Sequence, residues 1–160
     1  SGGPGQVGYR VNSPAIVICS PICQDPSNNS KVCSLIMVLH GRGGTARSMV
    51  GLLLGRGAGD AFNEDADLGG PFCVSFHKSA GYGWDHQYNG EDVKHLEAFI
   101  PWALANWPTI DPESVNIHGH SSGGAMVVRM MNTGMPIERM ISAAAPHAAH
   151  TEKGVPTSAA

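Results

Sequence analysis

The feature that most constrains this chain is a glycine-flanked serine between a strand-like segment and a helix-like one. Residues 119–124 read Gly-His-Ser-Ser-Gly-Gly, after the apolar run at 115–117 and before a methionine-rich stretch. A G-x-S-x-G pattern at such a turn needs small neighbours, because its central residue has a strained backbone. The pattern predicts that the Ser121 hydroxyl projects at the positive end of a helix, where a developing oxyanion is stabilised. The alternative is a purely structural turn, and Ser122 is the less favoured nucleophile because Ser121 holds the central position.

A second glycine-rich segment follows the most apolar run of the chain, and it reads Leu39-His40-Gly41-Arg42-Gly43-Gly44. Such a bend can turn a backbone N–H toward the serine, and together with the N–H of Ser122 it would form an oxyanion hole. No Gly-Lys-Ser or Gly-Lys-Thr follows, so phosphate binding is disfavoured. The remaining alternative is an ordinary strand-to-helix loop.

Strand-like and helix-like segments alternate along the chain. The strand-like runs are 15–19, 33–39, 72–76, 115–118 and 140–144, and the helix-like stretches are 45–54, 90–107 and 122–132. This alternation predicts an α/β fold with a mostly parallel, doubly wound sheet, whose ligands bind beyond the carboxyl ends of the strands. Pro101 predicts a kink or a break in the second helix. Met126, Val127, Met130 and Met131 form a stripe that is typical of a buried core.

Composition excludes several classes of protein. The chain has 160 residues, of which 42% are hydrophobic and 14% charged, so it suits a single domain with a core. Its net charge of -3 leaves no basic excess to neutralise a nucleic-acid backbone. The longest apolar runs fall well short of the roughly 20 residues that a membrane-spanning helix needs.

The cysteines and histidines do not form a metal-binding pattern. Cys19 and Cys23 have C-x3-C spacing and no second pair matches it, so the four cysteines (Cys19, Cys23, Cys33 and Cys73) are either disulfides or small buried residues. His118 and His120 share a strand face, and His40 ends another strand, but no metalloprotease motif or carboxylate cluster accompanies them. We therefore predict no metal and no cofactor. Asn28-Asn29-Ser30 fits the pattern for N-glycosylation.

An aromatic segment at 81–88 follows the third strand-like run, and it contains Tyr82, Trp84 and Tyr88. It would line a substrate pocket if it lies at the carboxyl side of the sheet, and otherwise it is a packed surface loop. Trp102 and Trp107 are expected in the core. The Arg42 side chain would either contact substrate or lie exposed.

Three stretches of sequence resemble the α/β-hydrolase superfamily, and within it the polyhydroxybutyrate depolymerases and the feruloyl and acetylxylan esterases. They are LIMVLHGRGG, GEDVKHLEAFIPWAL and IDPESVNIHGHSSGGAM, and the resemblance covers about residues 30–146. It implies that Ser121 is the nucleophile and that the amides of Arg42 and Ser122 form the oxyanion hole. It further implies a serine esterase that acts through an acyl-enzyme on a polyester or a polysaccharide-linked ester. The resemblance, the cysteines and the glycosylation pattern together suggest an extracellular or periplasmic protein.

The rest of the catalytic triad does not follow in the expected order. α/β-Hydrolases place an Asp or Glu and then a His after the serine. Here Asp92 and Asp111 precede Ser121, and only Glu138, Glu152, His147 and His150 follow it. His147 comes too early, directly after the strand-like run at 140–144.

We therefore interpret residues 1–160 as one incomplete α/β-hydrolase-like domain, an amino-terminal portion that stops before the catalytic acid and histidine. Three alternatives stay open. The first is a minimal enzyme that recruits His147 or His150. The second is a catalytically dead binding domain. The third is a serine peptidase of the prolyl oligopeptidase type, although those enzymes usually carry an HGGPG-like loop where this chain has HGRGG.

Overall fold

The computed structural model describes residues 5–7, 15–54, 70–132 and 141–147. Their strands form one six-stranded sheet of order β1-β2-β4-β3-β5-β6. The strands are β1 (Gly5–Val7), β2 (Ala15–Cys19), β3 (Cys33–Leu39), β4 (Phe72–His77), β5 (Ile110–His120) and β6 (Ile141–His147). The helices are α1 (Ala46–Leu54), α3 (Glu91–Asn106) and α4 (Ser122–Met131), with a short 3-10 turn η1 (Pro21–Gln24).

The sheet is mixed, with its antiparallel strands at one edge. β4, β3, β5 and β6 run parallel to one another, whereas β1 and β2 pair antiparallel. Leu39 at the end of β3 is the register partner of Gly119 near the end of β5. The glycine-rich loop after β3 and the serine turn after β5 therefore leave the sheet side by side, at the same carboxyl edge.

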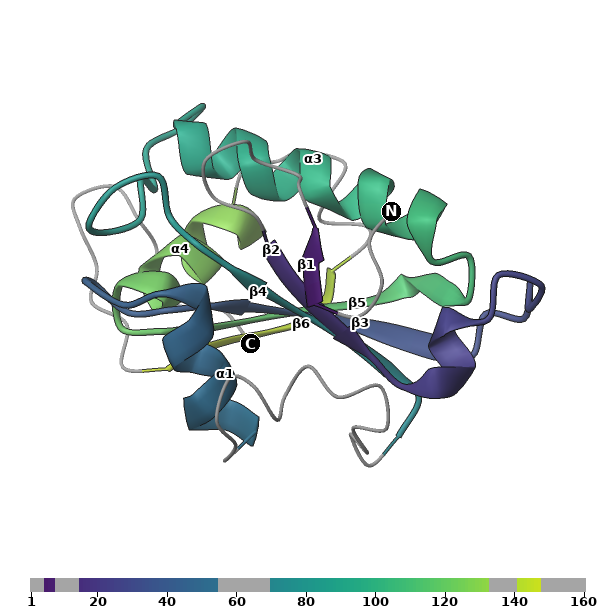
Figure 1. Cartoon of the computed structure of the whole chain (residues 1–160). Coiled ribbons are helices and arrows are strands. Elements are labelled where there is room, and N and C mark those ends of the chain that lie inside the picture. Colours follow the sequence, from purple (N-terminus) through teal and green to yellow (C-terminus); the bar gives the residue numbers. More distant parts are fainter. Residues whose placement is uncertain (1–4, 8–14, 55–69, 133–140, 148–160) are drawn as a thin grey trace.

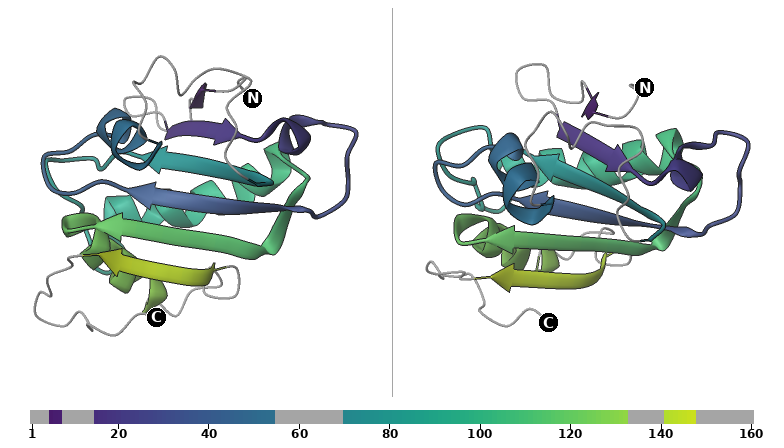
Figure 2. Two further views of the ribbon diagram at one scale, coloured as in Figure 1. Left: turned by 90° about the horizontal axis from the view of Figure 1, so that it is seen from below. Right: turned by 60° about the horizontal axis from the view of Figure 1, so that its bottom comes forward.

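Helices cover both faces of the sheet, so it is doubly wound as the sequence predicts (Figure 1). α3 and α4 lie on one face, where Leu35, Met37 and Leu39 of β3 pack against Phe99 and Met126. α1 lies on the other face against a smaller cluster. Figure 2 shows the arrowheads of the parallel strands pointing to one end of the molecule. Because side chains alternate along β3, this almost continuously apolar strand contributes residues to two separate cores, one on each face of the sheet.

The three predicted helices form, but α3 does not break at Pro101. The helix continues to Asn106 with Pro101 inside it. Pro101 is exposed. Water can therefore solvate the carbonyl that the missing proline N–H leaves without its helical partner. Of the predicted kink or break, the break does not occur, because the buried residues of α3, including Phe99 and Ala103, continue past the proline and hold both halves on the sheet.

The methionine stripe on α4 lies in the core, as its sequence predicts, and α1 begins at Ala46, one residue after the predicted start. Met126 and Met130 are fully buried in the core. Thr45 caps the start of α1, because its Oγ1 accepts the Ser48 N–H at 3.0 Å while the Ser48 Oγ accepts the Thr45 N–H at 3.0 Å. This reciprocal cap fixes where the chain turns from the glycine-rich loop into the helix.

All four cysteines are paired. Cys19 bonds Cys73, joining β2 to β4, and Cys23 bonds Cys33, closing the segment between η1 and β3. The cysteines are also buried. Both disulfides lie at the amino-terminal ends of β3 and β4, away from the serine turn. In the described ranges, no helix combines the length and the apolar character that crossing a bilayer would need.

Candidate active site

Ser121 lies at a sharp turn between β5 and α4. Its φ of 53° and ψ of -114° are a conformation that residues with a side chain rarely adopt. The turn is tight because its glycines touch backbone. A β-carbon on Gly119 would lie 2.2 Å from the Gly123 carbonyl oxygen, and one on Gly123 would lie 2.5 Å from the Leu39 carbonyl oxygen. Both glycines are therefore required sterically.

The glycine-rich loop at residues 40–44 contacts this turn. A β-carbon on Gly41 would lie 3.5 Å from the Ser121 Cβ and 3.2 Å from the His120 Cδ2. The loop is folded on itself, because the Gly44 N–H donates to the Gly41 carbonyl at 2.9 Å. Within the described ranges, no hydrogen bond uses the backbone N–H of Arg42, and Ser122 N–H belongs to the first turn of α4, which has no helical acceptor. In the described ranges these two N–H groups, one in the residue after Gly41 and one in the residue after Ser121, therefore have no acceptor within the protein.

His40 is buried under this loop, with 1% of its surface exposed. Its Nδ1 donates to the Gly41 carbonyl at 2.6 Å, and its Nε2 accepts the Ser79 N–H at 3.1 Å. Its own carbonyl accepts the Trp84 indole N–H at 2.7 Å. Burial lowers the pKa of His40 below its ordinary value, with the bond to Gly41 opposing that shift. The imidazole is thus kept neutral and committed to structural hydrogen bonds.

The aromatic segment belongs to the loop at residues 79–90, and a buried carboxylate holds that loop from inside. Asp92, in the first turn of α3, is fully buried. It accepts the Ala80 N–H at 2.9 Å and the Asp85 N–H at 2.8 Å. The Asp85 carboxylate in turn accepts the Glu91 N–H at 3.2 Å, at the start of α3. From the sequence, Asp92 stood out only as an acidic residue that precedes Ser121, and its reach back to Ala80 has no sequence signature.

The loop at 79–90 lies over the glycine-rich loop and encloses a pocket of about 320 Å³. The Gly43 N–H donates to the Tyr82 carbonyl at 2.7 Å, and the Trp84 N–H reaches the Ser122 Oγ at 3.4 Å. The sequence left open whether this segment lines a substrate pocket or packs on the surface. Of its aromatic residues, Trp84 is buried and lines the pocket, whereas Tyr82 and Tyr88 are exposed. The pocket is lined by Arg42, Gly81, Gly83, Trp84, Asp85, His86 and Ser122.

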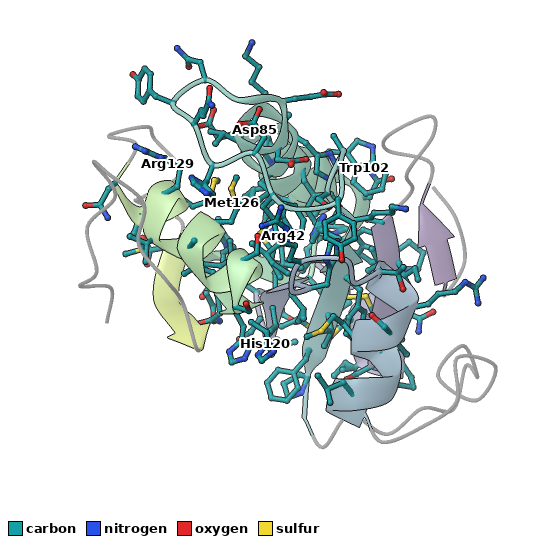
Figure 3. The ribbon with its side chains drawn as sticks, turned by 90° about the vertical axis from the view of Figure 1, so that its left-hand side faces the viewer. Arg42, Asp85, Trp102, His120, Met126 and Arg129 are labelled. Carbon is teal, nitrogen blue, oxygen red and sulfur yellow. A yellow bond between two sulfur atoms is a disulfide. The ribbon has the colours of Figure 1, made fainter. Side chains whose placement is uncertain are left out.

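Figure 3 looks onto this end of the molecule, with Arg42 near its centre. The Arg42 side chain is exposed, and its guanidinium carbon lies 5.5 Å from the centre of the Tyr82 ring. Arg129 of α4 holds the far side of the loop, because its Nε donates to the His86 carbonyl at 2.5 Å. The Ser122 hydroxyl is buried and contacts the loop, so Ser121 is the more exposed of the two serines.

The histidines that follow Ser121 are only partly described. His147 ends β6, and its backbone is the register partner of His120. His150, Glu138 and Glu152 lie outside the described residues. In the described ranges there is no group of three His, Cys, Asp or Glu side chains that could hold a metal ion. His40, which the sequence placed among metal candidates, has both ring nitrogens engaged by Gly41 and Ser79.

Comparisons with known proteins show the fold. No protein-family model matches the chain, and no curated protein matches it. Among solved structures, an acetyl xylan esterase from Aspergillus awamori aligns with a TM-score of 0.58 at 17% identity, over 87% of this chain and 49% of that one. A thermophilic esterase from Thermogutta terrifontis, solved with butyrate bound, aligns with a TM-score of 0.52 at 15% identity, over 89% of this chain and 52% of that one.

The chain therefore has an α/β-hydrolase type of fold. It spans about half the length of each of these two solved structures. At these identities the likeness concerns the fold and does not extend to the chemistry of the site.

Proposed function

We propose that this chain carries the nucleophile and oxyanion hole of a serine hydrolase that cleaves carboxylic esters. The observation that carries the proposal is the backbone of Ser121, held at φ 53° between two glycines that admit no side chain. A strained residue persists only where its surroundings impose it, and such strain is concentrated at functional sites. The closeness of Gly41 to Ser121 also supports the proposal, because it brings the glycine-rich loop next to the nucleophile.

In this proposal Ser121 Oγ attacks the carbonyl carbon of the ester, and the carbonyl oxygen becomes negatively charged. The N–H groups of Arg42 and Ser122 donate to that oxygen. The alcohol then leaves, and water hydrolyses the acyl-serine to release the acid. Neither step needs a metal or an organic cofactor.

Serine needs a base, and we propose that it comes from sequence beyond residue 160. The order serine, acid, histidine in α/β-hydrolases supports this, as does the length of the matched structures, which is about twice that of this chain. Residues 1–160 would then be one hydrolase-like domain without its acid and histidine, and His147 or His150 would not substitute for them.

The proposed substrate is a polyester or a polysaccharide-linked ester, with no nucleic-acid or membrane partner. This rests on the resemblance of the sequence around Ser121 and Arg42. Two disulfides and the exposed loop with the Asn28 glycosylation pattern support an extracellular or periplasmic location.

A fluorophosphonate probe tests the proposal on the full-length protein. We expect covalent label on Ser121, identified by peptide mass spectrometry, and its loss in Ser121→Ala. Ser122→Ala is the matched control and should still be labelled, because Ser122 contributes its backbone N–H and not its hydroxyl. Absence of label in the folded wild-type protein would overturn the proposal and favour a binding domain. Cleavage of peptide anilides but not of p-nitrophenyl butyrate would indicate a peptidase instead.

A further inference from the structure

We propose that His40 is a positioning residue, which aims the Arg42 N–H at the oxyanion by holding the Gly41 carbonyl in the opposite direction. This inference rests on the proposed function, because it concerns how the oxyanion hole of that site is built. His40 touches no reacting atom, so it acts through the Gly41–Arg42 peptide.

The first step concerns which nitrogen of His40 carries the proton. A carbonyl oxygen can only accept, so the 2.6 Å contact to the Gly41 oxygen requires a proton on Nδ1. The backbone N–H of Ser79 can only donate, so Nε2 at 3.1 Å carries none. The Ser79 hydroxyl donates to the Gly81 carbonyl at 2.7 Å and leaves this assignment intact. Its two neighbours therefore select one neutral tautomer of His40.

The second step concerns the peptide between Gly41 and Arg42. No peptide bond in the described ranges is cis, so the Gly41 carbonyl and the Arg42 N–H lie in one peptide plane and point in opposite directions within it. The Gly41 oxygen accepts from both His40 Nδ1 and the Gly44 N–H. Because these two donors fix the carbonyl, the plane cannot rotate and the Arg42 N–H keeps one direction. Gly41 itself packs against Ser121, which places that plane beside the proposed nucleophile.

The third step is that His40 is itself immobilised from the far side. Trp84 donates its indole N–H to the His40 carbonyl at 2.7 Å, and the two rings lie 5.0 Å apart. Ser79 and Trp84 both belong to the loop at 79–90, which Asp92 holds. The loop that lines the pocket thus also fixes the position of the His40 imidazole. Preorganised donors of this kind need no rearrangement when charge develops.

The arrangement depends on His40 staying neutral. A proton on Nε2 would place two donors, Nε2–H and Ser79 N–H, against each other. The charged groups that act on the imidazole are Lys78, next to Ser79, and Asp92 of α3, and they oppose one another. Two further titratable side chains lie at this loop, His120 beside Gly41 on the β5 side and Tyr82 beside Gly43.

Two substitutions separate this role from simple packing. In His40→Asn the amide nitrogen can replace Nδ1 as donor to Gly41, whereas in His40→Gln the side-chain oxygen replaces Nε2 and the donor to Gly41 is lost. We expect His40→Gln to lower the acylation rate of the full-length protein with p-nitrophenyl butyrate by about 10²–10³-fold at unchanged KM, the usual effect of losing one oxyanion donor. We expect His40→Asn to stay within about tenfold of wild type. Equal losses in both variants, or no loss in His40→Gln, would overturn the inference.

A measurement on the unmodified protein covers the case in which the variants do not fold. Long-range ¹H–¹⁵N spectra report which imidazole nitrogen is protonated, and we expect Nδ1–H for His40. An Nε2–H tautomer would contradict the proposed role of His40, because Nδ1 could then not donate to the Gly41 carbonyl. This result would hold independently of the esterase activity of the variants. Failure of the proposed function is seen separately, because Ser121→Ala would then keep its activity while the His40 tautomer stayed as described.

Discussion

The two ends of the sheet are held together by different chemistry. At the amino-terminal ends of β3 and β4, two disulfides join residues of β2, η1, β3 and β4. Thr109 closes the same end, since its Oγ1 donates to the Cys23 carbonyl at 2.8 Å and its carbonyl accepts the Cys33 N–H at 3.0 Å. At the carboxyl end, the loops at 40–44 and 79–90 are joined by directional hydrogen bonds through His40, Trp84 and Asp92.

The difference indicates that one end of the sheet contributes mainly to stability and the other mainly to the geometry of the candidate site. A disulfide acts mainly by restricting the unfolded chain, so it stabilises the fold without prescribing which way an N–H points. Hydrogen bonds contribute less each, but they fix direction, and direction is what an oxyanion site requires. We therefore expect perturbations of the first end to change stability, and perturbations of the second to change chemistry.

The largest expected effect comes from removing the disulfides. Replacing Cys19 and Cys73 by alanine opens a loop of sequence separation 54, and replacing Cys23 and Cys33 opens one of 10. Loop entropy predicts losses of about 4 and about 3 kcal/mol respectively in the free energy of unfolding. Urea denaturation measures both. The labelling rate of Ser121 in the folded fraction should not change, and a change would mean that the two ends are coupled.

The next effect is steric and lies at the serine turn. Gly119→Ala forces a β-carbon to within 2.2 Å of the Gly123 carbonyl oxygen, backbone against backbone. We expect the free energy of unfolding to fall by about 3 kcal/mol, the upper end of the range for overpacked sites. We also expect Ser121 to lose its labelling by the fluorophosphonate probe. Gly81→Ala is the control, because its β-carbon would meet nothing closer than 3.8 Å, and its melting temperature should match wild type. Equal melting temperatures for both variants would contradict the tight turn.

A smaller effect should have the opposite sign. Ser121→Gly removes the strain of a side chain at φ 53°, so we expect a gain of about 1 kcal/mol in stability together with complete loss of labelling. Ser121→Ala keeps the strain and should lose labelling without the gain. Differential scanning calorimetry compares the two. If Ser121→Gly is no more stable than Ser121→Ala, the strain at this residue is not real.

The smallest expected effect is on pH dependence. The pKa of His40 is lowered in the folded state, so the unfolded chain binds more protons as the pH falls below the ordinary histidine value of about 6.5. The contribution of His40 to stability is therefore complete above that pH and decreases as the pH falls toward the folded-state pKa. The stability difference between wild type and His40→Asn should shrink from about pH 7.5 to about pH 5.5. A constant difference would show that His40 does not titrate differently on unfolding.

Sequence patterns predicted some elements closely and missed others for physical reasons. The strands at 15–19 and 33–39 agree residue for residue with β2 and β3, because their apolar runs are almost continuous. β5 begins at Ile110 rather than at 115, since its first part carries Asp111, Pro112 and Glu113 and pairs irregularly with β3. β1 escaped notice because Gly5–Val7 is too short to show a period.

The candidate site also combines features that the sequence predicted with contacts that it could not predict. The glycines around Ser121 and Arg42 are local requirements, so a single stretch of sequence shows them. The contacts of Ser79 and Trp84 with His40 join residues 39 and 44 positions apart, and no pattern links them. The pairing of the cysteines is equally non-local, which is why the sequence left disulfides and buried thiols as alternatives.

By itself the sequence determined the alternation of strands and helices, the sharp turn at Ser121 and the apolar run that becomes β3. These follow from backbone sterics and from the period of apolar side chains, which act over a few residues. Only the tertiary structure decided that the loop at 79–90 closes over the glycine-rich loop, that Asp92 and His40 hold it there, and which cysteines meet. Those contacts depend on parallel strands that bring distant segments to one edge of the sheet. The order of the strands cannot be predicted from the sequence of any single strand.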